Sequence, residues 1–441
     1  MSSAKKIGLF ACTGVVAGNM MGSGIALLPA NLASIGGIAI WGWIISIIGA
    51  MSLAYVYARL ATKNPQQGGP IAYAGEISPA FGFQTGVLYY HANWIGNLAI
   101  GITAVSYLST FFPVLNDPVP AGIACIAIVW VFTFVNMLGG TWVSRLTTIG
   151  LVLVLIPVVM TAIVGWHWFD AATYAANWNT ADTTDGHAII KSILLCLWAF
   201  VGVESAAVST GMVKNPKRTV PLATMLGTGL AGIVYIAATQ VLSGMYPSSV
   251  MAASGAPFAI SASTILGNWA APLVSAFTAF ACLTSLGSWM MLVGQAGVRA
   301  ANFPKVYGEV DSNGIPKKGL LLAAVKMTAL MILITLMNSA GGKASDLFGE
   351  LTGIAVLLTM LPYFYSCVDL IRFEGVNIRN FVSLICSVLG CVFCFIALMG
   401  ASSFELAGTF IVSLIILMFY ARKMHERQSH SMDNHTASNA H

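Results

Sequence analysis

Charged residues are scarce in this sequence, and their scarcity sets the surroundings of the protein. Asp, Glu, Lys and Arg together make up 8% of the 441 residues, whereas soluble domains carry about 25%. Hydrophobic residues account for 57% and gather in long runs. A water-soluble fold is therefore excluded, and the lipid bilayer is the expected environment.

Patterns typical of enzymes and metal sites are also missing. The sequence contains no HExxH or GxSxG motif, and no pair of carboxylates stands in the middle of an apolar run. The eight cysteines lie within or at the ends of apolar runs and form no loop framework, so disulfides and a metal site are not expected. An enzyme is therefore not expected, and neither is a cofactor.

The apolar runs are long enough to cross a bilayer, which takes about 20 apolar residues in a helix. What lies between them is too short for a separate soluble domain. The expected fold class is an all-α integral membrane protein with twelve transmembrane helices. The predicted spans lie near residues 10–34, 38–62, 84–112, 121–142, 147–168, 188–212, 220–244, 270–301, 319–338, 346–370, 380–401 and 404–421.

Basic residues gather on one side of the predicted membrane. Seventeen of the twenty Lys and Arg residues fall in the tails and loops on the side of the N-terminus, while the opposite loops carry acidic residues such as Asp117, Asp170 and Asp182. The positive-inside rule then places both termini in the cytoplasm. The net charge of +5 follows from this topology and does not indicate a nucleic-acid partner.

Glycine interrupts two of the predicted spans, one between Gly18 and Gly24 and the other between Phe200 and Ser205. Glycine lets a helix unwind, and the freed backbone groups survive in hydrocarbon only beside protein or a water-filled cavity. Paired interruptions in two halves of a chain are the best sequence-level indication of a transporter's substrate site. We therefore predict a secondary transporter with its site between the two breaks.

The two breaks also divide the chain into repeats. Spans 1–5 and 6–10 each open with a broken helix, and an odd number of spans makes the second group run inverted, as in inverted-repeat transporters. The tail beyond Arg427 is expected to be disordered. The predicted domains are a cytoplasmic N-terminus (1–9), a first repeat (10–168), an outside loop (169–187), a second repeat (188–372), two extra helices (373–421) and a cytoplasmic tail (422–441).

The breaks carry groups suited to a zwitterionic or cationic substrate. The half-helix after Gly22, Ser23 and Gly24 begins with free N–H groups and a positive dipole end, which suits a carboxylate, while carbonyls near Met20 suit a cation. Close packing of small residues is the alternative. Glu204 in the second break is a mid-membrane carboxylate, which indicates function by default; a structural carboxylate held by tyrosine or backbone hydrogen bonds is its alternative.

Aromatic and polar side chains within the spans complete the candidate site. A desolvated ammonium over an aromatic face gains about 2 kcal/mol, although bundle packing explains any single ring. On span 3, Asn93 and Asn97 share a face because they are four residues apart, and His91 could titrate in the acid range. Lys326 is interpreted as snorkelling from a helix end. The candidate rings are Trp198, Trp289, Tyr89, Tyr90 and Tyr363, with Tyr73 and Tyr235 as weaker candidates.

Several runs together resemble the basic amino acid/polyamine antiporters of the amino acid–polyamine–organocation superfamily. The resemblance covers essentially the whole chain and implies a five-plus-five inverted repeat that forms a homodimer in the bacterial inner membrane. The runs that carry it are Gly18–Gly24, Leu27–Ala30, Tyr89–Asn97, Leu197–Ser205, Lys214–Arg218 and Gly287–Gln295.

The resemblance also implies a substrate site. In that family a glycine-serine turn binds the carboxylate of the amino-acid substrate, and carbonyls of both broken helices meet its α-ammonium. A tryptophan stacks on the side-chain cation of the substrate, and residues of span 3 surround the tip of that side chain. The turn matches Gly22, Ser23 and Gly24, and the carbonyls match those near Met20, Trp198 and Val201. The stacking tryptophan matches Trp289, and the residues around the substrate tip match Ala92, Asn93 and Asn97. Tyr89, Glu204 and Tyr363, with Tyr90 beside them, match gating and proton-linked positions, and Trp198 matches an occluding ring.

Two departures from arginine-specific relatives bear on the substrate. Asn93 stands where they have cysteine and Ala355 where they have serine, which suits the three donors of an ammonium better than the planar five of a guanidinium. The resemblance implies exchange of external lysine for internal cadaverine, coupled to a lysine decarboxylase and to acid resistance. Exchange of arginine for agmatine or ornithine for putrescine, proton-coupled uptake, and a channel or receptor remain alternatives.

A third departure lies in the loop after span 8. Asn302 runs straight into Phe303 and Pro304, where the family has an Asp-Gly pair before the Phe-Pro. About three residues are therefore expected to be missing from this inside loop.

Overall fold

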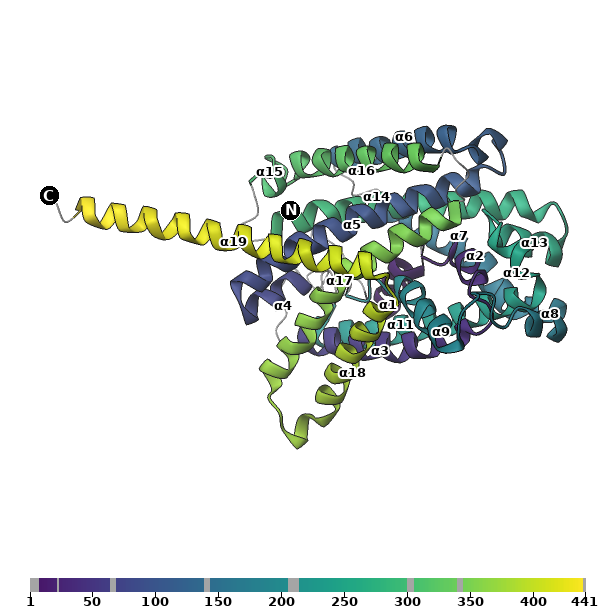
Figure 1. Ribbon diagram of the computed structural model, residues 1–441, viewed down its shortest axis with the longest axis horizontal. Helices are drawn as coiled ribbons and strands as arrows, with labels where there is room; N and C mark the ends of the chain where they lie inside the picture. Colours follow the sequence, from purple (N-terminus) through teal and green to yellow (C-terminus); the bar gives the residue numbers. More distant parts are fainter. Residues whose placement is uncertain are drawn as a thin grey trace.

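A computed structural model describes residues 8–21, 24–63, 69–138, 143–204, 214–299, 305–338 and 344–438 of the chain. These residues form a bundle of helices from which the last helix, α19, projects (Figure 1). The helices are α1 Leu9–Met21, α2 Leu28–Ala33, α3 Ala39–Lys63, α4 Pro70–Ile77, α5 Pro79–Leu108, η1 Pro113–Asn116, α6 Pro118–Met137, α7 Val143–Val164, η2 Gly165–Trp168, α8 Ala171–Ala176, α9 Asp185–Trp198, α11 Pro216–Met245, α12 Ser248–Ala252, α13 Pro257–Leu266, α14 Ala270–Arg299, α15 Lys305–Gly308, α16 Lys317–Asn338, α17 Ala344–Glu374, η4 Ile378–Asn380, α18 Phe381–Met399 and α19 Ser403–Ser438.

Nine helices among the described residues are long and apolar enough to cross a membrane. Three more predicted spans accompany them. The first and sixth are broken, which leaves α1 and α9 too short to qualify by length. The third, α5, has 30 residues, but polar side chains such as Gln84, Asn93 and Asn97 lower its hydropathy. The twelve-span fold is thus confirmed, and these three spans carry many of the candidate site residues.

The order of the elements repeats in the two halves. Each half opens with a broken helix, continues with the long helix α3 or α11, and then has the short helix α4 or α13 directly before a 30-residue helix, α5 or α14. Two long helices close each half. The two 30-residue helices pack along each other, which places the equivalent third spans of the two repeats side by side at the centre of the bundle (Figure 1).

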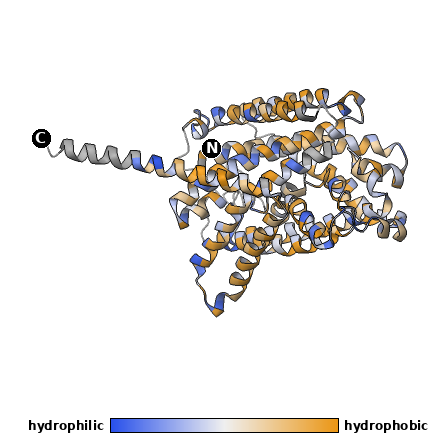
Figure 2. Ribbon diagram, in the orientation of Figure 1, coloured by the Kyte–Doolittle hydropathy of each residue, from blue (hydrophilic) through white to orange (hydrophobic). Residues whose placement is uncertain are grey.

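Figure 2 shows that hydrophobic residues predominate along the helices of the bundle. Large hydrophobic side chains are exposed on its outer helices, for example Ile123 on α6 at 64% and Phe395 on α18 at 65%. Such exposure is unfavourable in water but expected against lipid. Helix α19 continues to Ser438, so the prediction of a disordered tail beyond Arg427 was wrong. The residues after the membrane span simply extend its last helix.

The predicted outside loop is held in place by polar contacts. Asp170 caps α8 because its carboxylate accepts hydrogen bonds from the hydroxyl and backbone N–H of Thr173 and from the N–H of Ala172, and these bonds lower the pKa of Asp170. The Asn177 amide donates to the carbonyls of Ser243 and Tyr246, both at 2.8 Å. The loop is thereby tied to the end of α11.

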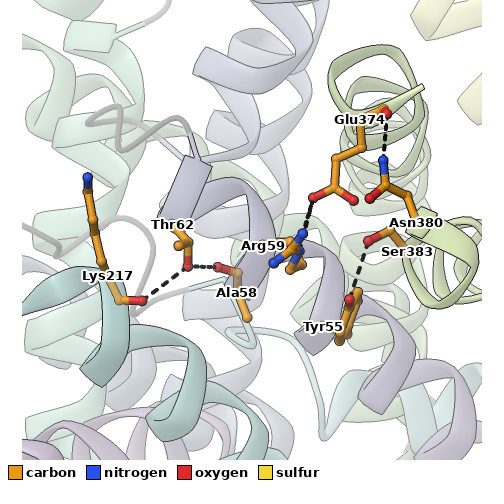
Figure 3. A network of polar contacts seen from close by, with 8 residues as sticks. All are labelled: Tyr55, Ala58, Arg59, Thr62, Lys217, Glu374, Asn380 and Ser383. Carbon is orange, nitrogen blue, oxygen red and sulfur yellow. Dashed lines mark hydrogen bonds and ion pairs between the residues drawn. The ribbon is translucent and has the colours of Figure 1, made fainter. Parts of the chain in front are cut away.

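At the opposite end of the bundle, polar contacts join the end of α3 to α11, α17 and α18 (Figure 3). Arg59 Nε donates to Glu374 Oε1 at 3.0 Å. The Glu374 side chain is only 2% exposed, whereas that of Arg59 is 33% exposed. Glu374 Oε2 has no hydrogen-bond partner among the described residues, so Arg59 is the group that compensates this buried charge.

Replacing Arg59 by methionine is expected to destabilise the protein by about 2 kcal/mol. This figure lies between the value of a surface ion pair and that of a fully buried pair, because one partner is buried and the other is not. Thermal unfolding in detergent measures the change. The double variant Arg59→Met with Glu374→Leu should recover most of the stability, since it removes the buried charge as well. An unchanged melting temperature in the single variant would contradict this account.

Candidate functional site

The two helix breaks lie against each other. Helix α1 ends at Met21 and α9 at Trp198, and the second break contains Gly202 in the left-handed region with φ of +106°, which favours glycine. A Cβ added to Gly24 would lie 2.9 Å from the Met20 carbonyl oxygen and 3.6 Å from the Ala199 Cα. The first break is therefore in van der Waals contact with the second, and the Met20 carbonyl leaves no room for a Cβ at Gly24.

A small cavity lies at this meeting point. It draws on both breaks and on helices α5, α14 and α17. Among the residues that the structure describes, no Asp or Glu lines this cavity. The lining residues are Met20, Gly24, Ala92, Asn93, Gly96, Asn97, Ile100, Trp198, Val201, Trp289, Ala355 and Thr359.

Most of the predicted substrate-binding residues therefore meet in one place. The exceptions are Gly22 and Ser23, which lie outside the described residues. Sequence reasoning missed Gly96, Ile100 and Thr359 as wall residues. Gly96 and Ile100 could have been found by spacing, because they continue the face of Asn93 and Asn97 at intervals of three and four residues. Thr359 belongs to a different helix, α17, and carries no comparable signal.

Two glycines make room for the Trp198 indole. A Cβ on Gly96 would lie 3.0 Å from the indole Cη2, and a Cβ on Gly24 would lie 3.8 Å from its Nε1. The ring thus passes between α5 and the first break. Any side chain at position 96 would have to displace the Trp198 ring, so the absence of a side chain there allows the ring to pack against α5.

The two asparagines of α5 differ in their hydrogen bonding. Asn93 Nδ2 donates to the carbonyl of Tyr89 at 2.7 Å within the same helix. Neither polar atom of the Asn97 side chain has a partner among the described residues, although Asn97 is only 1% exposed. A buried amide without partners costs about 1–3 kcal/mol. Asn97 thus offers both a donor and an acceptor to a molecule in the cavity.

Glu204 lies in the second break and is fully buried. Tyr89 Oη donates to its Oε1 at 2.7 Å, and Tyr363 Oη donates to its Oε2 at 2.9 Å. Tyr363 in turn packs edge-on against Tyr57, with ring centroids 5.9 Å apart. The carboxylate therefore links α5, the second break and α17. Both oxygens are held, so any movement of these three elements relative to each other changes its hydrogen bonds.

The remaining predicted residues lie away from the cavity wall. Tyr73 on α4 packs beside Tyr57 at 6.3 Å between ring centroids. Tyr235 on α11 packs against Trp43 at 5.5 Å and against Phe200 at 5.7 Å. Phe200 belongs to the second break, so Tyr235 contacts the site through it. The hydroxyls of Tyr73 and Tyr235 have no hydrogen-bond partner among the described residues.

Tyr90 and His91 turn instead toward α15 and α16. Tyr90 Oη donates to the carbonyl of Gly319 at 2.9 Å. His91 lies 3.3 Å from the ammonium of Lys326. Lys326 stands near the middle of α16, so its interpretation as a residue snorkelling from a helix end was wrong: it is held inside the protein by named partners.

A multi-pass membrane bundle with its cavity at two broken helices defines the class of a secondary transporter. The chain belongs to the amino acid permease family, which matches residues 7–421. Membership confirms the predicted superfamily and the prediction that the chain is a transporter and not an enzyme.

Similar proteins of known activity narrow the class further. The chain is 99% identical, over all of both sequences, to the cadaverine/lysine antiporters of Escherichia coli strain K12 and Escherichia coli O157:H7. It is 32% identical to the putrescine transporter PotE of Escherichia coli strain K12, over 90% of this chain and 92% of that one. The alignment with the antiporters spans 444 positions against 441 residues here, a difference of three. The prediction of a shortened loop near Asn302 falls outside the described residues.

Proposed function

We propose that this chain exchanges external lysine for internal cadaverine by alternating access. The observation that carries the proposal is the cavity between the two breaks, taken with 99% identity to cadaverine/lysine antiporters. An ammonium group in this cavity would meet the indoles of Trp198 and Trp289 and the amide of Asn97 rather than a carboxylate. Such a site suits a cation that has to be released on both sides.

The proposed roles follow from the chemistry of each position. The N–H groups of Gly22, Ser23 and Gly24 would hold the lysine carboxylate, as in other broken-helix transporters. Cadaverine has no carboxylate and would do without that contact. Glu204, with Tyr89 and Tyr363, would change its hydrogen bonds when the site opens and closes.

Charge balance dictates what drives the cycle. Lysine carries one positive charge and cadaverine two, so each cycle would export one net positive charge. At 100 mV, inside negative, this export is opposed by about 2.3 kcal/mol. A steep outward cadaverine gradient must supply the drive, which makes a lysine decarboxylase the functional partner. Decarboxylation consumes a proton, so the pathway would support acid resistance.

The proposal includes a setting for the protein. We place it in the bacterial inner membrane with both termini in the cytoplasm, because basic residues gather on that side. Two five-span repeats, residues 10–168 and 188–372, would move against each other around the cavity. The resemblance to the basic amino acid/polyamine antiporters supports a homodimer.

Substrate pairing in proteoliposomes tests this function against its alternatives. Vesicles are loaded with cadaverine, putrescine or agmatine, and uptake of labelled lysine, ornithine or arginine is measured in each. The proposal predicts that the lysine and cadaverine pair exchanges fastest. Faster exchange of ornithine for putrescine or of arginine for agmatine would reassign the substrates. Lysine uptake driven by a pH gradient into unloaded vesicles would favour proton-coupled uptake.

Replacing Asn97 by leucine is expected to weaken lysine binding about tenfold while stabilising the empty protein. The substrate would lose one hydrogen bond to its ammonium, worth about 1.5 kcal/mol or more, and the protein would lose an unsatisfied buried amide. Scintillation proximity binding and thermal unfolding without substrate measure the two effects. Lower stability together with unchanged affinity would contradict this role for Asn97.

A further inference from the structure

A second polar cluster lies on the side of α5 away from the cavity. It consists of Tyr90 and His91 on α5, Tyr307 on α15 and Lys326 on α16, and we call it the Lys326 cluster. His91 precedes the cavity residue Asn93 by two positions, or about 200° of helix rotation. The proposed exchange gives this cluster no role.

The ammonium of Lys326 is held by two acceptors and two aromatic rings. Its Nζ lies 3.3 Å from His91 Nε2 and 3.2 Å from Tyr307 Oη. The same atom lies 4.9 Å from the ring centroid of Tyr307 and 5.2 Å from that of Tyr90. Among the described residues, no carboxylate pairs with Lys326. A lone cation in the middle of a membrane helix indicates a function.

The histidine tautomer is consistent with this arrangement. His91 Nδ1 lies 2.8 Å from the carbonyl oxygen of Val87, and a carbonyl can only accept. Nδ1 therefore carries the hydrogen in the neutral ring, which leaves Nε2 as the acceptor for the Lys326 ammonium. The imidazole thus bridges the backbone of α5 to a charge on α16.

The cluster also fixes α15 in place. A Cβ on Gly297 of α14 would lie 2.5 Å from the Tyr307 carbonyl oxygen, and a Cβ on Gly319 of α16 would lie 2.6 Å from it. The Tyr307 ring packs edge-on against Tyr90 at 5.1 Å, and Tyr90 donates to the Gly319 carbonyl. Helix α15 is thus seated between α14 and α16 and tied to α5 through its tyrosine.

Helix α5 is therefore held from two sides. The preceding residue, Tyr89, binds Glu204 in the second break, while Tyr90 and His91 bind α16. Any rotation of α5, or its separation from α16, breaks the contacts of the Lys326 cluster. The cluster lies in the half of α16 that begins with Lys317 and Lys318, the side that the positive-inside rule assigns to the cytoplasm.

We propose that Lys326 is a positioning residue for the exchange, whose ammonium clamps α15 and α16 onto α5 and holds the cytoplasmic side of the site closed. Opening to the cytoplasm requires the clamp to release. Because the clamp stabilises the outward-competent state only, its loss shifts the population toward the inward-competent state. A shift of this kind changes the apparent affinities of the two faces in opposite directions. The inference rests on the proposed exchange.

The test is the KM on each face in vesicles of defined orientation. Lys326→Met is expected to raise the KM for external lysine about fivefold or more and to lower the KM for cytoplasmic cadaverine by a similar factor. Lys326→Arg keeps a cation with donors and should stay within about twofold of wild type on both faces. Lys191→Met, which removes an exposed lysine from α9, is the matched control and should change neither value.

A second variant guards against misfolding. His91→Phe removes one acceptor and leaves the Lys326 ammonium in place, so it should shift both KM values in the same two directions but less. Unchanged KM values on both faces, or an equal rise on both, in a folded Lys326→Met or His91→Phe would overturn the clamp. If wild-type vesicles exchange lysine for cadaverine normally, unchanged KM values in these variants overturn the clamp and leave the proposed function standing. Wild-type vesicles without exchange would sink the proposed function, and the inference with it.

Discussion

Replacing Glu204 by glutamine is expected to slow lysine/cadaverine exchange about 100-fold. The carboxylate accepts the hydroxyls of Tyr89 and Tyr363 with separate oxygens. The glutamine amide offers one accepting oxygen and one NH2 group that can only donate, so one tyrosine hydroxyl must turn or lose its acceptor. Hydrogen bonds to charged groups are worth about 1.5–3 kcal/mol each. A loss of about 2.7 kcal/mol corresponds to the expected 100-fold.

The matched variant for this prediction is Tyr363→Phe. It removes one donor and keeps the carboxylate, so it should slow exchange about tenfold, in keeping with the loss of a single bond to a charged group. Thermal unfolding of both variants shows whether the protein remains folded. If folded Glu204→Gln transports both substrates normally, Glu204 is a structural carboxylate and its proposed role in gating is wrong.

Replacing Gly24 by alanine is expected to reduce exchange about as strongly. The new Cβ would lie 2.9 Å from the Met20 carbonyl oxygen and 3.6 Å from the Ala199 Cα, and both are backbone atoms that no side-chain rotation can move. The contact with the Met20 carbonyl is too short, so the backbone around Gly24 must shift. The Met20 carbonyl and the Trp198 indole beside Gly24 would then be misplaced, and misplacements on the order of 1 Å at a site can cost about 100-fold.

Gly14 on α1, the helix that precedes this break, provides the control. A Cβ at Gly14 would meet nothing within 4 Å, and alanine is favoured over glycine inside a helix by about 1 kcal/mol. Gly14→Ala should therefore keep full exchange and match or exceed the wild-type stability. Exchange rates of the two variants in the same vesicles measure the difference. Equal activity of Gly24→Ala and Gly14→Ala would show that the close approach of Gly24 to the Met20 carbonyl is not required.

Much of the site could be predicted because its signals are local in the sequence. The glycines at the breaks stand out against apolar helices, and Glu204 stands out as a carboxylate in the second of them. Asn93 and Asn97 were placed on one face by their spacing alone, and both line the cavity. The joining of Tyr89, Glu204 and Tyr363 was expected only from the family resemblance, since periodicity says nothing of contacts between distant helices.

What escaped prediction depends on partners far apart in the chain. The contact between Lys326 and His91 joins residues that are 235 positions apart in the chain. No local pattern reveals such a contact, so the sequence alone offered only snorkelling as an explanation for Lys326. Gly96 reads as an ordinary packing glycine until the Trp198 ring is placed against it. Beyond Arg427 the polar composition suggested disorder, but α19 continues through it.

Counterflow measures the central claim most directly. Uptake of labelled lysine is followed in proteoliposomes that contain cadaverine and in empty ones, at equal pH on both sides. Obligatory exchange through one cavity, which each cation occupies in turn, predicts rapid uptake only with internal cadaverine. Equal uptake into empty vesicles would contradict antiport and leave uniport or proton coupling.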